Sequence, residues 1–200
     1  HIGDRRQRQM CIRDSAHAAG RDALEFRLAH MNKNPKGAAV LKAVAERSGW
    51  GSDDGKHRGL AVLYGFGSYV AACADVTVDA EGSLKIDRII AATDCGTAVN
   101  PQQIEAQVEG SFVYGLSAAL FQEITLKNGE PQEDNFHAYP SMQISHMPKV
   151  ETIVMPSGGF YGGVGEPTIA VAAPAVLNAI FAATGKRVRY LPIKDQNLRA

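Results

Sequence analysis

The sequence predicts an α+β domain in which antiparallel hairpins pack against helices. Helical and strand patterns occur in blocks along the chain rather than in strict alternation, and this arrangement favours α+β over a parallel sheet. An apolar fraction of 45% is sufficient for a real hydrophobic core. A length of 200 residues corresponds to one ordinary domain or to a large piece of a bigger one.

Two helices are expected before the first strand. Residues 16–30 carry apolar side chains at near-helical spacing, and an Asn-Pro pair follows them. A second helix is predicted from Gly37 to Gly49, where the final glycine supplies a stop signal. The polar loop at residues 51–55 is the strongest internal boundary. We therefore expect a helical segment at 16–50 and a main domain at 51–200.

Strand patterns dominate the next part of the chain. Residues 58–72 are rich in Val, Leu, Tyr and Phe, and Gly65 and Gly67 within them indicate a bulge or a close approach of another backbone. Residues 73–79 alternate between apolar and polar side chains, and after a short turn residues 84–93 return as the second half of a hairpin. These segments pair most simply as antiparallel neighbours.

The central helix has a clear beginning. Asn100 is a good N-cap and Pro101 suits the first helical position, so a helix is predicted from there to about Leu120. Short strands are expected at 121–126 and 150–155, on either side of a long polar stretch.

The last helix is predicted over residues 167–184 and is almost entirely apolar, so it should be buried nearly all round. Gly185 provides its C-terminal stop. Pro174 is expected to kink the helix or to divide it into two pieces. Residues 190–193 are expected to form a short closing strand.

A glycine-dense loop precedes that helix and ends in a single carboxylate, Glu166, followed by Pro167. Glycines allow a backbone to approach a ligand closely. A carboxylate at the mouth of a buried helix can be a base with a raised pKa. It can equally be an ordinary partner of the helix dipole, and the residues alone leave both interpretations open.

Other phosphate-binding loops do not fit this glycine-rich segment. A Walker loop requires a Lys at its end, and the segment contains none. A dinucleotide-binding fingerprint requires a third Gly near Thr168 and an acidic residue about 20 positions further on, and neither is present.

Composition excludes several function classes. The formal net charge is zero, so no nucleic-acid-binding footprint is visible. No apolar run reaches the ~20 residues of a membrane span. Cys11, Cys73 and Cys95 are far apart, which argues against a zinc site, an iron–sulfur cluster or a disulfide framework. His137 and His146 lack partners at metal-ligand spacing, so no metal held by side chains is expected.

The first 15 residues have no clear period, and their Arg-Gln-Met-Cys-Ile-Arg-Asp-Ser end resembles a translated sequencing adapter. We expect residues 1–15 to be non-native. A basic arm is the alternative, because the segment is rich in arginine.

Several blocks resemble the large subunit of the xanthine oxidase family of molybdenum hydroxylases. The similarity is strongest to the isoquinoline 1-oxidoreductase beta-subunit type, which includes aldehyde-oxidising subunits, and it covers roughly residues 16–195. Only the C-terminal portion of that subunit is represented, as the C-terminal part of a molybdopterin-binding domain. The blocks that carry the resemblance are Asp75-Val76-Thr77-Val78-Asp79, Asp94-Cys95-Gly96-Thr97-Ala98-Val99-Asn100-Pro101, Gln107-Val108-Glu109-Gly110-Ser111, Gly163-Val164-Gly165-Glu166-Pro167 and Asn178-Ala179-Ile180-Phe181-Ala182-Ala183-Thr184-Gly185.

The resemblance implies a role for each matching residue. Glu166 corresponds to the catalytic base, and Gln107 to a glutamine that contacts the cofactor. Residues 163–165, which are Gly163, Val164 and Gly165, correspond to the loop beside the metal centre. Ser111 departs from the second glycine of the family's "E-G-G" pattern. Phe160 and Tyr161 can line a substrate pocket for a flat ring or can simply plug the loop.

The resemblance also implies cofactors and partners. The family binds a molybdenum–molybdopterin cofactor, expected here in its cytosine dinucleotide form, through the pterin rather than through protein side chains. A small subunit with 2Fe–2S clusters and a cytochrome electron acceptor are expected partners. The substrate is an N-heterocycle or an aldehyde, oxidised with water-derived oxygen. The fragment alone is expected to be inactive, and the compartment, bacterial periplasm or cytoplasm, is left open. The rival hypothesis is a non-catalytic subunit-interaction module.

Overall fold

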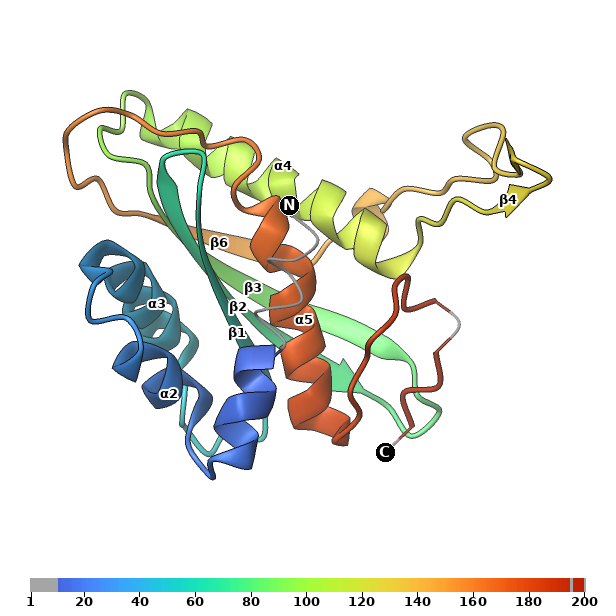
Figure 1. Ribbon diagram of the computed structural model, residues 1–200, viewed down its shortest axis with the longest axis horizontal. Helices are drawn as coiled ribbons and strands as arrows, with labels where there is room; N and C mark the ends of the chain where they lie inside the picture. The colour runs from blue at the N-terminus through green and yellow to red at the C-terminus, as the bar shows by residue number, and fades with distance from the viewer. Residues whose placement is uncertain (1–10, 195, 200) are drawn as a thin grey trace.

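A computed structural model describes residues 11–194 and 196–199 and confirms the α+β class (Figure 1). Its helices are α2 (Ala23–Ala29), α3 (Pro35–Ser48), α4 (Pro101–Leu120) and α5 (Ile169–Thr184), with a 3-10 turn at Ile144–His146. Its strands are β1 (His57–Gly65), β2 (Ser68–Val78), β3 (Leu84–Asp94), β4 (Leu126–Lys127), β5 (Glu130–Pro131) and β6 (Lys149–Val154).

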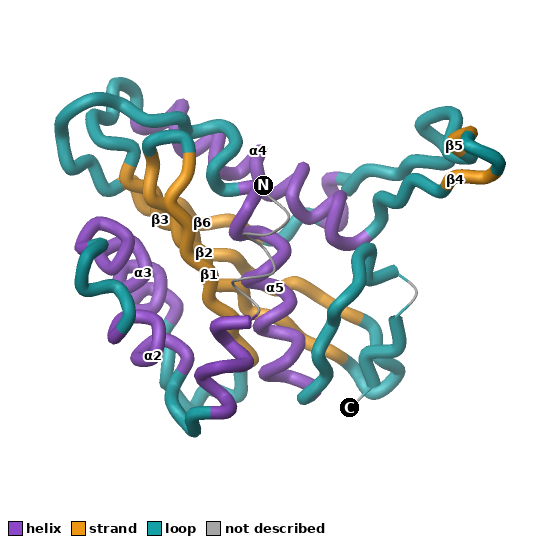
Figure 2. Tube along the Cα trace, viewed as in Figure 1, coloured by secondary structure: helices purple, strands orange, loops and turns teal. Residues whose placement is uncertain are grey.

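The main sheet has the strand order β1-β2-β3-β6. The pairs β1–β2 and β2–β3 are antiparallel hairpins, as the alternating pattern predicted, whereas β6 joins β3 in parallel. A parallel neighbour requires a long crossover, and α4 with the segment after it provides that connection. Figure 2 shows β4 and β5 as a small separate ribbon that projects away from the sheet.

Helices cover both faces of the sheet (Figure 1). On one face, α4 and α5 enclose the larger core, which includes Val70, Ile89, Phe112, Leu116 and Ile180. On the other face, α3 packs on the sheet through a second cluster that includes Val40, Leu41, Val44, Leu60 and Ile90. Burial on both faces explains why the central strands are apolar almost throughout.

The strand expected over residues 58–72 is instead the tight hairpin of β1 and β2. Phe66 and Gly67 form the turn with φ values of +54° and +79°. Positive φ at both central residues fits the right-handed twist of a two-residue hairpin. Sequence patterning missed this turn because Phe66 is an unusual residue there, and its aromatic character resembles a strand.

The helix expected over residues 16–30 is two helices. Residues 11–18 are helical, Gly20 takes a φ of +61°, and α2 then begins. Asp22 caps α2, accepting hydrogen bonds from the backbone N–H groups of Leu24 and Glu25 at 2.8 and 3.0 Å. A local cap therefore prevails over the apolar spacing that suggested one continuous helix.

Of the segment predicted to be non-native, residues 1–10 lie outside the described residues. In its described part, Arg13 donates to the carbonyl of Leu177 at 3.2 Å and lies 4.6 Å from the ring centroid of Phe181. That part thus packs on α5. The non-native origin of residues 1–15 and the boundary at residue 50 stay predictions.

Other expectations need smaller corrections. α5 begins at Ile169 rather than at residue 167, and it runs through Pro174 without dividing. The strand expected at 121–126 is reduced to β4, and residues 190–193 form no strand. These short segments have few main-chain partners, and tertiary context decides their conformation. Among the described residues, we find no helix with the length and apolar character that a membrane crossing requires.

Candidate cofactor and active site

The glycine-dense loop connects β6 to α5 and lies across one end of the sheet. It passes the β1–β2 turn and the loop that leads into α4 (Figure 1). The N–H of Gly162 donates to the carbonyl of Cys95, and the N–H of Gly163 donates to that of Phe66, both at 2.8 Å. The loop is therefore bonded to two separate connections of the sheet.

Close backbone approach explains why glycine is required in this loop. A Cβ atom placed on Gly162 would lie 2.4 Å from Ser68 Oγ and 2.6 Å from the backbone of Gly67. A Cβ atom placed on Gly96 would lie 2.3 Å from the carbonyl oxygen of Phe160. The sequence-based expectation of a close backbone contact near Gly67 is confirmed.

Side-chain hydroxyl groups also hold the loop. Ser68 Oγ donates to the carbonyl of Gly163, and Thr97 Oγ1 donates to that of Gly159, both at 2.6 Å. Ser111 Oγ donates to the carbonyl of Gly165. Sequence reasoning did not identify these three hydroxyls as site residues, and no local signal marks them, because their partners are backbone atoms far along the chain.

Asp94 is a further residue that the sequence did not single out. Its buried carboxylate accepts hydrogen bonds from Ser157 Oγ at 2.8 Å and from the N–H of Gly96 at 3.0 Å. The neighbouring Cys95 is also buried, and burial raises the pKa of its thiol. Asp94 thus joins the end of β3 to the beginning of the loop.

The structure brings Gln107 next to the loop residues predicted with it. Gln107 is exposed on α4, and a Cβ atom placed on Gly165 would lie 3.0 Å from its Oε1 atom. Val164 packs against the larger core, which fixes the middle of the Gly163–Gly165 segment. Gln107, residues 163–165 and the adjoining Glu166 therefore lie at the same end of the molecule.

Glu166 is an exposed residue in the turn just before α5. Its backbone carbonyl accepts from the N–H of Ile169 at 3.1 Å, so the carboxylate is carried by the first hydrogen-bonded turn of that helix. Within the described part of the chain its side chain makes no hydrogen bond or ion pair. The carboxylate is thus available to a group outside this chain.

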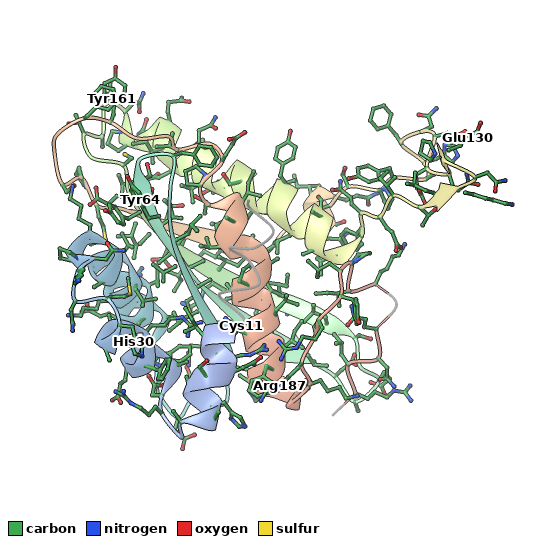
Figure 3. All side chains as sticks on the ribbon, viewed as in Figure 1. Cys11, His30, Tyr64, Glu130, Tyr161 and Arg187 are labelled. Carbon is green, nitrogen blue, oxygen red and sulfur yellow. The ribbon has the colours of Figure 1, made fainter. Side chains whose placement is uncertain are left out.

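Phe160 and Tyr161 lie on the outer side of the loop. Their rings are stacked, with centroids 4.7 Å apart and an interplanar angle of 16°. They are 87% and 60% exposed, respectively, and Figure 3 shows Tyr161 at the edge of the molecule. The pair presents an aromatic surface to its surroundings, and its role beside a substrate stays a prediction.

The residues at this end fit a ligand that is held through its own polar atoms. Thr168 is 1% exposed, and its buried Oγ1 has no hydrogen-bond partner. Gly158 and Gly159 have φ values of +75° and +83°, and a Cβ atom on either would meet nothing within 4 Å. In the described ranges, no three His, Cys, Asp or Glu side chains are grouped as metal ligands.

An open sheet covered by helices on both faces, with a glycine loop across one end, defines a cofactor-binding class of domain. The sequence profile of the molybdopterin cofactor-binding domain matches residues 9–148. The chain belongs to that family, as found in the large subunits of xanthine oxidase-type molybdenum hydroxylases.

Two relatives illustrate the similarity. The chain is 34% identical to the beta subunit of isoquinoline 1-oxidoreductase from Brevundimonas diminuta over 179 residues, which is 86% of this chain and 23% of the relative. It is 31% identical to a nicotinate dehydrogenase subunit of Pseudomonas putida over 210 residues, covering 94% and 18%. The chain thus spans about a fifth of the length of these relatives.

Solved structures agree with the sequence comparisons. The CO dehydrogenase from Oligotropha carboxidovorans superposes with a TM-score of 0.58 at 26% identity, over 66% of this chain and 18% of that one. Aldehyde oxidoreductase from Desulfovibrio gigas superposes with a TM-score of 0.54 at 28% identity, over 66% and 15%. Both neighbours confirm the predicted resemblance at the level of fold.

Proposed function

We propose that this domain forms one wall of the active site of a molybdenum hydroxylase, with Glu166 as the general base. The observation that carries this proposal is the meeting of Gln107, Gly165 and Glu166 at one end of the sheet. Two packed elements, α4 and the glycine loop, supply these residues. Sites built on such fixed elements hold their groups in a reproducible geometry.

The residues of this chain would act in three ways. The side-chain amide of Gln107 and the backbone of residues 163–165 would bind and orient the molybdopterin cofactor. Once bound, the cofactor would supply the oxidising centre of the reaction. The carboxylate of Glu166 would accept a proton at one of its oxygens as water-derived oxygen is transferred to the substrate.

The substrate class follows from the relatives' names and from the exposed aromatic pair. Relatives are named for isoquinoline and for nicotinate, which are N-heterocycles, and others for aldehydes. The stacked rings of Phe160 and Tyr161 offer an apolar wall of the kind that binds a flat ring. We therefore favour an N-heterocycle or an aldehyde as substrate, with oxidation at the electron-poor carbon.

The complete enzyme would contain further parts. We propose a cytosine dinucleotide form of the cofactor, a small subunit with 2Fe–2S clusters that carries electrons away, and a cytochrome acceptor. The names of the relatives, which are those of single subunits, support a multi-subunit enzyme. On this proposal the chain by itself would be inactive, because its site residues are exposed on one side.

The test is Glu166→Gln in the cofactor-loaded protein. This substitution keeps the size of the side chain but removes the proton acceptor, so kcat should fall by about 10²–10⁴-fold. Molybdenum content should be unchanged. Glu105→Gln is the matched control, since Glu105 is an exposed residue on α4 outside the proposed machinery. Near-normal turnover in a fully metallated Glu166→Gln variant would exclude the base assignment and favour a non-catalytic interaction module.

A further inference from the structure

The glycine loop is anchored by side chains from separate parts of the fold. Ser68 begins β2, Thr97 follows β3, and Ser111 lies on α4. Each donates its hydroxyl proton to a loop carbonyl, those of Gly163, Gly159 and Gly165 respectively. The carbonyls of the loop are thus held toward the protein at several points along its length.

Ser111 has the most informative position of the three hydroxyls. It is 2% exposed, and its Oγ lies within hydrogen-bond distance of two carbonyls, that of Gly165 and that of Gln107 one turn earlier at 2.8 Å. One side chain therefore contacts the residue before Glu166 and the turn of α4 that carries Gln107. The "E-G-G" pattern of the resembling family has glycine at this position and no hydroxyl.

Peptide geometry carries this contact to Glu166. The C=O of Gly165 and the N–H of Glu166 belong to the same planar trans unit. A hydrogen bond from Ser111 to that carbonyl therefore restricts the plane from which the Glu166 side chain departs. Because the alternative acceptor is on Ser111's own helix, loss of the loop bond would not leave the hydroxyl without a partner.

We propose that Ser111 is a positioning residue that fixes Glu166 relative to Gln107. Ser68 and Thr97 hold the loop upstream of this point in the same way. The inference rests on the proposed function in one respect, namely that Glu166 is the base. The hydrogen bond from Ser111 to the loop is independent of that role.

The experiment compares Ser111→Ala with Ser117→Ala in the cofactor-loaded protein. Ser117 is an equally buried serine of α4, also 2% exposed, and its Oγ donates to the carbonyl four residues earlier, at 2.7 Å. It accepts from the N–H of Met142 rather than contacting the glycine loop. The two variants lose the same atom from the same helix but differ in contact with the loop.

Three readouts are expected to change in Ser111→Ala and to stay constant in Ser117→Ala. Amide hydrogen exchange of the peptide covering residues 158–166 should accelerate about fivefold, the effect of one net hydrogen bond. The kcat value should fall about 10- to 100-fold through misplacement of the base, with KM within twofold. Ser111→Thr, which restores the hydroxyl, should recover most of both losses. Molybdenum content should equal that of the unmodified protein.

The outcomes separate this inference from the proposed function. Unchanged loop exchange and unchanged kcat in Ser111→Ala would overturn the positioning role. Faster exchange with unchanged kcat would also overturn it, provided that Glu166→Gln is inactive, because the hydroxyl would then serve the loop alone. An active Glu166→Gln would instead remove the proposed function and with it the meaning of positioning, whatever the exchange data show.

Discussion

Burial sets the chemistry of the cysteine side chains. Cys73 is fully buried on β2, and burial raises the pKa of its thiol to about 12, an effect that the nearby Ser48 hydroxyl only partly offsets. Cys11 is exposed. At pH 8 we expect iodoacetamide to label Cys11 and to leave Cys73 unmodified until the protein is unfolded, because the thiolate is the reactive form. Peptide mass spectrometry would decide the matter, and equal labelling of both residues in the folded protein would contradict it.

The same thiol makes stability depend on pH. The pKa of Cys73 is raised in the folded state from its ordinary value of 9.0 to about 12. The stability linked to this group is therefore fully present below about pH 9 and is lost progressively as pH rises toward 12. Urea unfolding across that range should show a decline in the free energy of unfolding that Cys73→Ala reduces. An identical decline in the variant would show that other groups are responsible.

At the residue scale, the sequence identified what is contiguous and missed what is distant. The segment Gly163–Gly165 with Glu166 is a local motif, and Gln107 belongs to a second motif on α4. Ser68 and Thr97 carry no such signal, since their hydroxyls bond backbone carbonyls more than 60 positions away. The catalytic and binding roles of the predicted residues stay predictions.

Elements with local start signals were predicted well. Asn34 and Asn100 both accept a hydrogen bond from the backbone three residues later, at 3.1 and 3.2 Å, and begin α3 and α4 as the Asn-Pro pairs indicated. The parallel pairing of β6 with β3 could not be predicted from patterning. It depends on a crossover through α4 whose two ends meet only in the folded molecule.

The crossing of α4 and α5 leads to a prediction about packing. A Cβ atom on Gly115 would lie 2.6 Å from the Cβ of Ala172, whereas one on Gly110 would meet nothing within 4 Å. Gly115→Ala should therefore lower the free energy of unfolding by about 1–3 kcal/mol through overpacking. Gly110→Ala, the control on the same helix, should raise it by up to about 1 kcal/mol through helix propensity. Urea unfolding followed by circular dichroism measures both, and equal shifts would show that the helices separate at no cost.

At the scale of the whole molecule, apolar surface is concentrated in two places. One is the glycine loop with Phe160 and Tyr161, and the other is the projecting ribbon around β4 and β5, where Phe136 is 90% exposed (Figure 2). Contiguous exposed apolar side chains usually mark surfaces that contact another chain or domain. Because the chain spans about a fifth of its relatives, both regions are consistent with contacts in a larger enzyme.

The last prediction concerns cofactor retention by this chain alone. The candidate binding groups, Gln107 and Glu166, are both exposed, and the described residues offer no cluster of metal-ligating side chains. Ligand sites that hold a cofactor normally bury most of its surface, which a single open wall cannot do. We therefore expect the isolated chain to fold, as judged by circular dichroism, yet to contain far less than one molybdenum per chain. The complete enzyme purified in parallel should be close to fully loaded. Stoichiometric molybdenum in the folded isolated chain would show that this wall is sufficient, and that the remaining four-fifths of a relative's length contributes little to binding.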